Sequence, residues 1–237
     1  LLIKPRKSSG SRGIRIIKCR QDLVPTYMQI HEVYPYPIIQ EYIESVETFE
    51  VGLLFNPQSQ LRAFFVFKHV RKFPVGMGPS VVQESVWYPE VVEKALSIMK
   101  KLDWYGIVDF EFIVDKRDGK IKFIEINPRF WNSLHMAILA GVDFPWLLYR
   151  LAMEGDVEEV FTYKTGLKCR NLLPGDMLHF IANKERNKMD PPFLGGEKYN
   201  MHDDIISLSD PLPVLGFVLA CLRYLGDRKM WKFIFER

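Results

Sequence analysis

Residues 105–131 constrain the fold more than any other stretch, because they contain two short alternating segments joined by a turn. In residues 107–114 apolar side chains alternate with Asp109 and Glu111, which is the two-residue period of a half-buried strand. Residues 121–127 alternate in the same way, and an Asp-Gly pair lies between the two segments. The pattern predicts a β-hairpin with one apolar face and one polar face.

The length of the turn decides which side chains face each other across the predicted hairpin. A two-residue Asp-Gly loop would send Glu111 and Glu125 to opposite faces of the sheet. A three-residue loop at 117–119, with Gly119 in the left-handed conformation, places Glu111 opposite Glu125 and Asp109 opposite Asn127. This second register also pairs Phe112 with Ile124 on a fully apolar face, so it is the register we predict.

The predicted register gathers carboxylates and an amide on one face, where like charges directly opposite each other repel. A divalent cation would neutralise them, and Mg²⁺ is commonly held by such oxygen ligands together with phosphate and water. A solvated polar face with Lys and Arg nearby is the alternative interpretation. Arg129 favours the metal site, because a guanidinium beside a carboxylate-bound metal suits a transferring phosphoryl group.

The first twenty residues carry seven basic side chains and no acidic one, and residues 8–13 are rich in Ser and Gly. Backbone N–H groups freed by glycine, hydroxyl groups and cations are the components of a phosphate site. An ordinary surface loop has the same composition, and the chain contains no Walker pattern G-x-x-x-x-G-K-[ST].

Two segments, DFEF…EINPR and IKPRKSSGSRGI, resemble the metal-binding hairpin and the strand with glycine-rich flap of the ATP-grasp superfamily. The resemblance is greatest to the carbamoyl phosphate synthetase-like branch and covers residues 1–155. It implies an α+β fold in which nucleotide lies between two subdomains. These are a glycine-loop subdomain in residues 1–43 and a metal-hairpin subdomain in residues 44–155, followed by a helical extension of unknown role in residues 156–237.

The resemblance also implies roles for individual residues. Glu111, Glu125 and Asn127 would hold Mg²⁺, with Mn²⁺ as an alternative ion, while Lys4 and Arg129 would contact the phosphates as the catalytic residues. Residues 41–43 would present the backbone to adenine, and Glu47, or Glu50 as an alternative, would bind the ribose. An exposed strand carboxylate is the competing interpretation of Glu47. The full set of expected nucleotide-binding residues is Lys4, Ser9, Gly10, Ser11, Gly13, Glu41, Tyr42, Ile43 and Glu47.

The activity implied by the resemblance is an ATP-dependent ligation of a carboxylate to an amine or similar nucleophile, through an acyl phosphate and with release of ADP. Residues 68–80 are basic and contain glycine, so we expect a mobile loop in which Arg71 or Lys72 reaches phosphate or the acceptor. A non-catalytic nucleotide-binding module and a basic nucleic-acid-binding protein remain as alternatives.

The composition narrows the classes of partner that the chain is expected to bind. A net charge of +3 over 237 residues carries no strong argument for nucleic acid or a membrane surface. The three cysteines are far apart without a C-x-x-C pair, which indicates reduced thiols and a cytoplasmic location. The longest apolar run, residues 214–222, is too short to span a bilayer. We therefore expect small-molecule carboxylate and amine substrates, no nucleic acid and no membrane span, with a homodimer left open.

Both ends of the chain raise further expectations. The chain opens inside an apolar segment without a Met, so we expect that an N-terminal part is missing from it. The pattern of residues 212–237 predicts an amphipathic helix or helix pair. We expect it to dock on the core, and a dimer contact or contact with a membrane surface are the alternatives to docking.

Overall fold

The computed structural model describes residues 1–8, 10–76, 78–194, 196–207 and 210–225. The N-terminal part forms a small antiparallel sheet in the order β2-β1-β3, covered by helix α1. Its buried core consists of Ile3, Ile17 and Ile30. The bounds are β1 (Leu2–Lys4), β2 (Arg15–Ile16), α1 (Leu23–Val33) and β3 (Ile38–Gln40).

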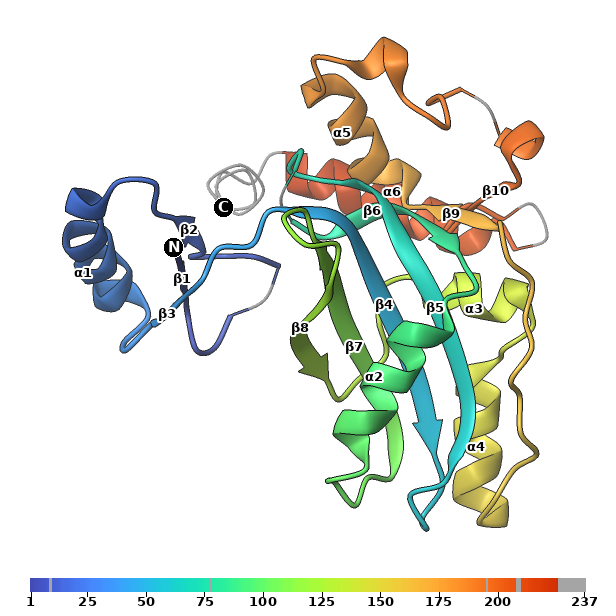
Figure 1. Cartoon of the computed structure of the whole chain (residues 1–237). Coiled ribbons are helices and arrows are strands. Elements are labelled where there is room, and N and C mark those ends of the chain that lie inside the picture. Colours follow the sequence, from blue (N-terminus) through green and yellow to red (C-terminus); the bar gives the residue numbers. More distant parts are fainter. Residues whose placement is uncertain (9, 77, 195, 208–209, 226–237) are drawn as a thin grey trace.

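The rest of the chain builds a larger sheet in the order β10-β9-β6-β5-β4-β7-β8. Its neighbouring strands are antiparallel except for the parallel pair β9 and β10. In Figure 1 the β8 edge of this sheet lies toward the small sheet. The bounds are β4 (Ser45–Phe55), β5 (Leu61–Lys72), β6 (Ser80–Ser85), β7 (Gly106–Asp115), β8 (Ile121–Asn127), β9 (Lys168–Arg170) and β10 (Met201–Asp203).

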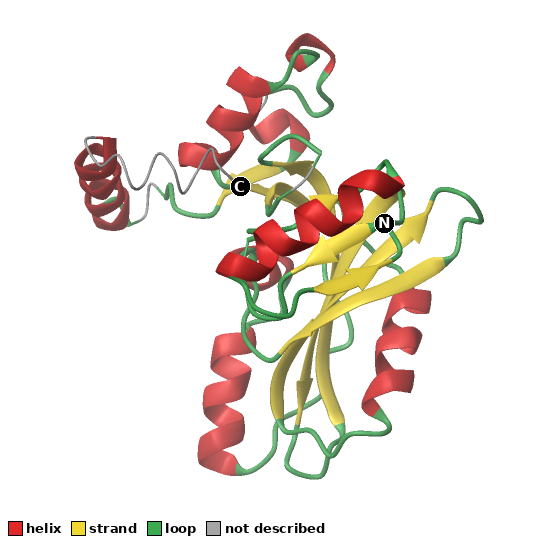
Figure 2. Ribbon diagram, turned by 90° about the vertical axis from the view of Figure 1, so that its left-hand side faces the viewer, coloured by secondary structure: helices red, strands yellow, loops and turns green. Residues whose placement is uncertain are grey.

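Helices cover both faces of the larger sheet, as Figure 2 shows. On one face, helix α2 (Pro89–Met99) packs its apolar side on alternate residues of β4 and β7, among them Val51 and Phe110. On the other face, α3 (Leu134–Ala140) and α4 (Phe144–Glu154) pack with Phe67 and Trp131. Because side chains alternate along a strand, the second face also carries the even-numbered residues of β4 and the odd-numbered residues of β7.

The hairpin of β7 and β8 has the predicted register at its polar end, where Glu111 pairs with Glu125 and Asp109 pairs with Asn127. The turn itself was predicted wrongly. The loop is 116–119, four residues rather than three, closed by hydrogen bonds from Asp115 N to Lys120 O at 3.0 Å and from Gly119 N to Asp115 O at 2.8 Å. A bulge after Glu111 absorbs the extra residue, so Phe112 faces Phe123 and not Ile124. Gly119 is left-handed as predicted, with φ 66°.

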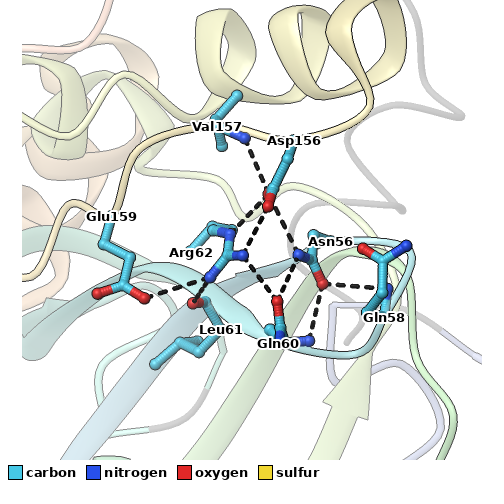
Figure 3. A network of polar contacts seen from close by, with 8 residues as sticks. All are labelled: Asn56, Gln58, Gln60, Leu61, Arg62, Asp156, Val157 and Glu159. Carbon is cyan, nitrogen blue, oxygen red and sulfur yellow. Dashed lines mark hydrogen bonds and ion pairs between the residues drawn. The ribbon is translucent and has the colours of Figure 1, made fainter.

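A polar network holds the loop between β4 and β5 against the chain that follows α4 (Figure 3). The Asn56 side-chain oxygen accepts hydrogen bonds from the backbone N–H groups of Gln58 and Gln60 at 3.1 and 2.9 Å. The Arg62 guanidinium binds the Asp156 carboxylate through two contacts of 2.6 Å each. Through this network the β4–β5 loop and the start of β5 hold a segment that lies 94 residues further along the chain.

The C-terminal region adds β9 and β10 to the larger sheet and contains the short helices η2 (Leu172–Asp176), α5 (Met177–Ala182), η3 (Arg186–Lys188) and η4 (Gly196–Tyr199). A buried ion pair fastens this region to β5. The guanidinium of Arg71 donates to both carboxylate oxygens of Asp176 at 2.8 and 2.9 Å, and also to the carbonyl of Pro191. Arg71 was one of two residues, with Lys72, that we expected to reach phosphate or the acceptor, and its guanidinium is instead held by these buried contacts.

Helix α6 (Leu212–Leu225) is the described part of the predicted C-terminal helix, and residues 226–237 lie outside the described residues. Four leucines of α6 are exposed: Leu212, Leu215, Leu219 and Leu222. In the described part of the chain no single helix is long and apolar enough to cross a membrane, and α3 and α4 meet those criteria only as a pair bent by 86°.

Candidate functional site

Polar side chains form a row across the middle of the larger sheet, on the face that carries Trp131. The strand registers place Gln83 beside His69 and Glu50 beside Glu111, which in turn pairs with Glu125. One step further along the strands, Gly52 lies beside Asp109 and leaves room for the Trp131 ring, because a Cβ there would be 2.1 Å from Trp131 Cη2. The row lines a single cavity together with the glycine loop: Gly10, Ser11, Glu50, His69, Gln83, Asp109, Glu111, Glu125, Asn127, Arg129, Trp131 and Ser133.

The carboxylates at the centre of the row raise one another's pKa. Burial raises the pKa of Asp109 well above its usual range, and the negative charges of Glu50 and Glu111 raise it further. Burial and the charge of Glu50 also raise the pKa of Glu111. Burial and mutual repulsion both disfavour the charged forms of these carboxyl groups, so a cation bound among them would stabilise the charged forms.

Lys4 brings the small sheet to the hairpin. Its Nζ lies 2.9 Å from Oε2 of Glu125. Burial by itself raises the pKa of Glu125, but the hydrogen bonds and charges of Lys4, Asn127 and Arg129 together outweigh burial, so this pKa is lowered. The Asn127 amide nitrogen lies 3.3 Å from Glu125 Oε1 and 3.4 Å from Asp109 Oδ2, while Arg129 Nη2 lies 3.2 Å from Asn127 Oδ1. Lys4, Glu125, Asn127 and Arg129 therefore form one connected polar group, and Glu111 pairs with Glu125 across the hairpin.

Solved structures share this fold. The chain matches biotin carboxylase from Campylobacter jejuni, solved as a β,γ-ATP complex, with a TM-score of 0.61, 19% identity and coverage of 70% of this chain and 40% of that one. N5-carboxyaminoimidazole synthetase from Staphylococcus aureus, complexed with ADP, matches with a TM-score of 0.57 and 18% identity, over 70% of this chain and 44% of that one. The biotin carboxylase domain of Hydrogenobacter thermophilus 2-oxoglutarate carboxylase, in complex with MgADP, matches with a TM-score of 0.58 and 21% identity. This match covers 70% of this chain and 39% of that one.

Sequence comparison points in the same direction. A family model described as "ATP-grasp in the biosynthetic pathway with Ter operon" matches residues 70–173. The arginine-specific large chain of carbamoyl phosphate synthase from Bacillus subtilis (strain 168) is 25% identical over 137 residues, which are 54% of this chain and 13% of that protein. The chain is thus similar to ATP-grasp proteins in sequence and in fold. It spans less than half the length of these ATP-grasp proteins.

The glycine loop reaches the cavity only in part. Gly10 and Ser11 line it, both with positive φ of 61° and 60°. Gly13 packs inside the small subdomain, where a Cβ would lie 2.8 Å from both Pro5 Cγ and Tyr34 Cε2. Ser9 lies outside the described residues.

The residues expected to contact adenine and ribose, 41–43 and Glu47, do not line the cavity. Strand β3 ends at Gln40, and the Glu41 carboxylate lies 2.6 Å from Arg117 Nη1 on the surface. Tyr42 is exposed and Ile43 is half-buried, in an irregular segment between β3 and β4. Glu47 is exposed beside Val114, whereas its alternative Glu50 lines the cavity. The nucleotide roles of all these residues stay predictions.

Three residues of the cavity, Gln83, His69 and Ser133, were not predicted from the sequence, and Lys72 was one of two candidates. His69 Nε2 contacts the carboxylate of Glu50. Lys72 Nζ donates to Thr48 Oγ1 at 2.8 Å, and burial lowers the pKa of Lys72 although Glu111 and Glu50 oppose that effect. The alternation of β5 contained the signal for His69, but the surrounding phenylalanines marked this stretch as core.

The residues present fit a magnesium ion that is shared with phosphate. Within the described ranges no three His, Cys, Asp or Glu side chains form a ready-made metal site. Mg²⁺ is usually held by one or two carboxylates while substrate phosphates and water supply the other ligands. Asp109 Oδ1 is buried without a hydrogen-bond partner among the described residues, and the neighbouring carboxylates repel one another. Both features indicate a site that is completed by a cation and its ligand.

The raised pKa of Glu111 predicts a pH dependence of stability. The folded protein holds this proton more tightly than the unfolded chain, so its free energy of unfolding falls as the pH rises from 4.5 through the raised pKa. Glu111→Gln removes this effect and should stabilise the ligand-free protein above that window by about 1.4 kcal/mol for each pKa unit. Urea unfolding at several pH values checks it: the advantage of the variant should grow with pH, and a constant difference would contradict the prediction.

Proposed function

We propose that the chain is part of a Mg·ATP-dependent ligase that joins a carboxylate to an amine through an acyl phosphate and releases ADP. The observation that carries the proposal is the pairing of Glu111 with Glu125 beside Lys4, which comes from the other subdomain. This arrangement provides anionic ligands for a metal ion and a cation for phosphate at the place where the two sheets meet. Two of the solved neighbours are complexes with MgADP and with ADP, which supports ATP and Mg²⁺ as ligands.

In the proposed reaction the residues act by position and charge rather than as nucleophiles. Glu111, Glu125 and Asn127 would hold Mg²⁺, which neutralises phosphate charge when bound. Lys4 would exchange its contact with Glu125 for one with a phosphate, and Arg129 would stabilise the phosphoryl group in transfer. The substrate carboxylate oxygen attacks the γ-phosphorus and ADP leaves. The amine nitrogen then attacks the acyl carbon, phosphate leaves, and the amine releases its proton to water.

Release of ADP by the full-length protein across a panel of carboxylates and amines tests the proposal. We expect ADP release to rise at least tenfold only when the correct carboxylate, the correct amine and Mg·ATP are all present. Tight binding of Mg·ATP without ADP release on any pair would instead indicate a nucleotide-binding module. The small-molecule partners, the homodimer and the cytoplasmic location stay predictions.

A further inference from the structure

Three buried polar atoms at the β5 and β6 end of the row have no hydrogen-bond partner among the described residues. They are His69 Nδ1, Gln83 Oε1 and Ser133 Oγ. Gln83 and Ser133 are each 1% exposed, and the His69 side chain is 6% exposed. All three line the cavity that also holds the metal carboxylates. Since buried polar groups in folded proteins are nearly always satisfied, these atoms indicate the place of a ligand.

The Gln83 amide oxygen requires a ligand that donates hydrogen bonds, because this oxygen can only accept them. The Ser133 hydroxyl can accept or donate, and so can His69 Nδ1, whose role depends on which ring nitrogen carries a proton while Nε2 contacts Glu50. The carboxyl groups of Glu50 and Glu111 line the same cavity and also accept hydrogen bonds. A primary amine offers several donors to this set, whereas a carboxylate has no donor for Gln83 Oε1.

These atoms lie apart from the metal hairpin. Strand β4 separates β5 and β6 from β7 and β8 in the larger sheet. Because neighbouring strands are about 4.8 Å apart, β5 lies roughly 10 Å from β7. A group bound at His69 and Gln83 therefore occupies the same cavity as the predicted metal and phosphates without occupying their place.

An apolar cavity adjoins the polar one. It shares Pro79, Ser80 and Asn132 with the polar cavity, and its other walls include Val81, Pro174 and Leu178. Its volume of about 180 Å³ is below the roughly 300–1,000 Å³ of sites for drug-sized ligands, so it suits a small apolar substituent. Pro174 and Leu178 belong to the C-terminal region, which the Arg71–Asp176 ion pair fastens to β5.

We propose that the two adjoining cavities form the acceptor subsite, and that the acceptor is a primary amine carrying a small apolar substituent, such as an apolar amino acid. His69, Gln83 and Ser133 bind its amino group, and Val81, Pro174 and Leu178 enclose the substituent. This inference rests on the proposed ligase function, because it names the nucleophile of that reaction. It also assigns a role to residues after 156, as the wall that selects the acceptor.

Binding of three simple probes to the full chain tests the inference by calorimetry. 3-Methylbutylamine carries both features, methylamine lacks the apolar group, and 4-methylpentanoate has a carboxylate in place of the amine. We expect 3-methylbutylamine to bind at least tenfold more tightly than methylamine, and 4-methylpentanoate not to bind. Each titration is run with and without Mg·ATP, so that failure of nucleotide binding is seen separately from failure of amine binding.

Two variants locate the subsite. Gln83→Leu should weaken both amines at least tenfold, while the matched change Gln58→Leu in the exposed β4–β5 loop should not. Leu178→Trp fills the apolar cavity and should weaken 3-methylbutylamine but not methylamine, with Leu194→Trp at an 87% exposed leucine as control. If a variant fails to fold, the comparison of the three probes on the wild-type chain still tests the inference.

The outcomes separate the two proposals. Amine binding with the expected order but no binding of Mg·ATP would retain the amine subsite and remove the ligase function. Binding of Mg·ATP with 4-methylpentanoate bound as tightly as 3-methylbutylamine would overturn the amine assignment and keep the ligase function. Absence of amine binding in both conditions, or equal effects of Gln83→Leu and Gln58→Leu, would likewise overturn it.

Discussion

Glu125→Gln is expected to abolish the stabilisation of this protein by Mg·ATP, and Glu111→Gln to do the same. Each change keeps the shape of the side chain and removes the charge that serves the metal. A ligand at 100 times its dissociation constant stabilises a protein by about 2.7 kcal/mol, so the loss is readily seen in a thermal shift with and without Mg·ATP. The fold should survive, because the Lys4–Glu125 contact is partly exposed and is worth about 1 kcal/mol or less.

Glu93→Gln is the matched control for these variants, because Glu93 lies exposed on α2. That variant should keep the full Mg·ATP shift. A Glu125→Gln or Glu111→Gln protein that Mg·ATP stabilises as strongly as wild type would remove the hairpin carboxylates from the proposed metal site.

Asp176→Ala is expected to destabilise the protein by about 3–5 kcal/mol, because it leaves the buried guanidinium of Arg71 without its carboxylate. The side chains of Arg71 and Asp176 are only 4% and 0% exposed. The pair joins β5 to the C-terminal region, so the variant should also loosen the wall formed by Pro174 and Leu178. Urea unfolding of the variant and the wild type measures the difference in free energy.

The exposed pair Arg150–Glu154, at 2.6 Å on the surface of α4, provides the control. Glu154→Ala should cost less than about 1 kcal/mol, since exposed ion pairs contribute little. The double variant Arg71→Met/Asp176→Leu should lose less stability than Asp176→Ala, because it leaves no buried charge behind. Equal costs for Asp176→Ala and Glu154→Ala would show that burial does not make the Arg71 pair essential.

The sequence by itself determined the features that depend on neighbours along the chain. Alternation predicted both strands of the hairpin. The pairing of Glu111 with Glu125 was also predicted from local information, although the apolar pairing of Phe112 with Ile124 that supported this register is not formed. The length of the turn was predicted wrongly, because a bulge allows a longer loop to keep the same polar register.

Only the tertiary structure decided which residues of different strands share the cavity. Arg71 and Lys72 are neighbours in a basic stretch, yet Arg71 is buried against Asp176 while Lys72 reaches Thr48 and the carboxylates. Adjacent side chains on a strand point to opposite faces, and the irregular pairing of β5 with β6 near Arg71 shifts that alternation. The meeting of His69 with Glu50, and the position of Gln83 beside them, depend on registers among three strands. Such registers arise from packing over the whole sheet, which no single stretch of sequence encodes.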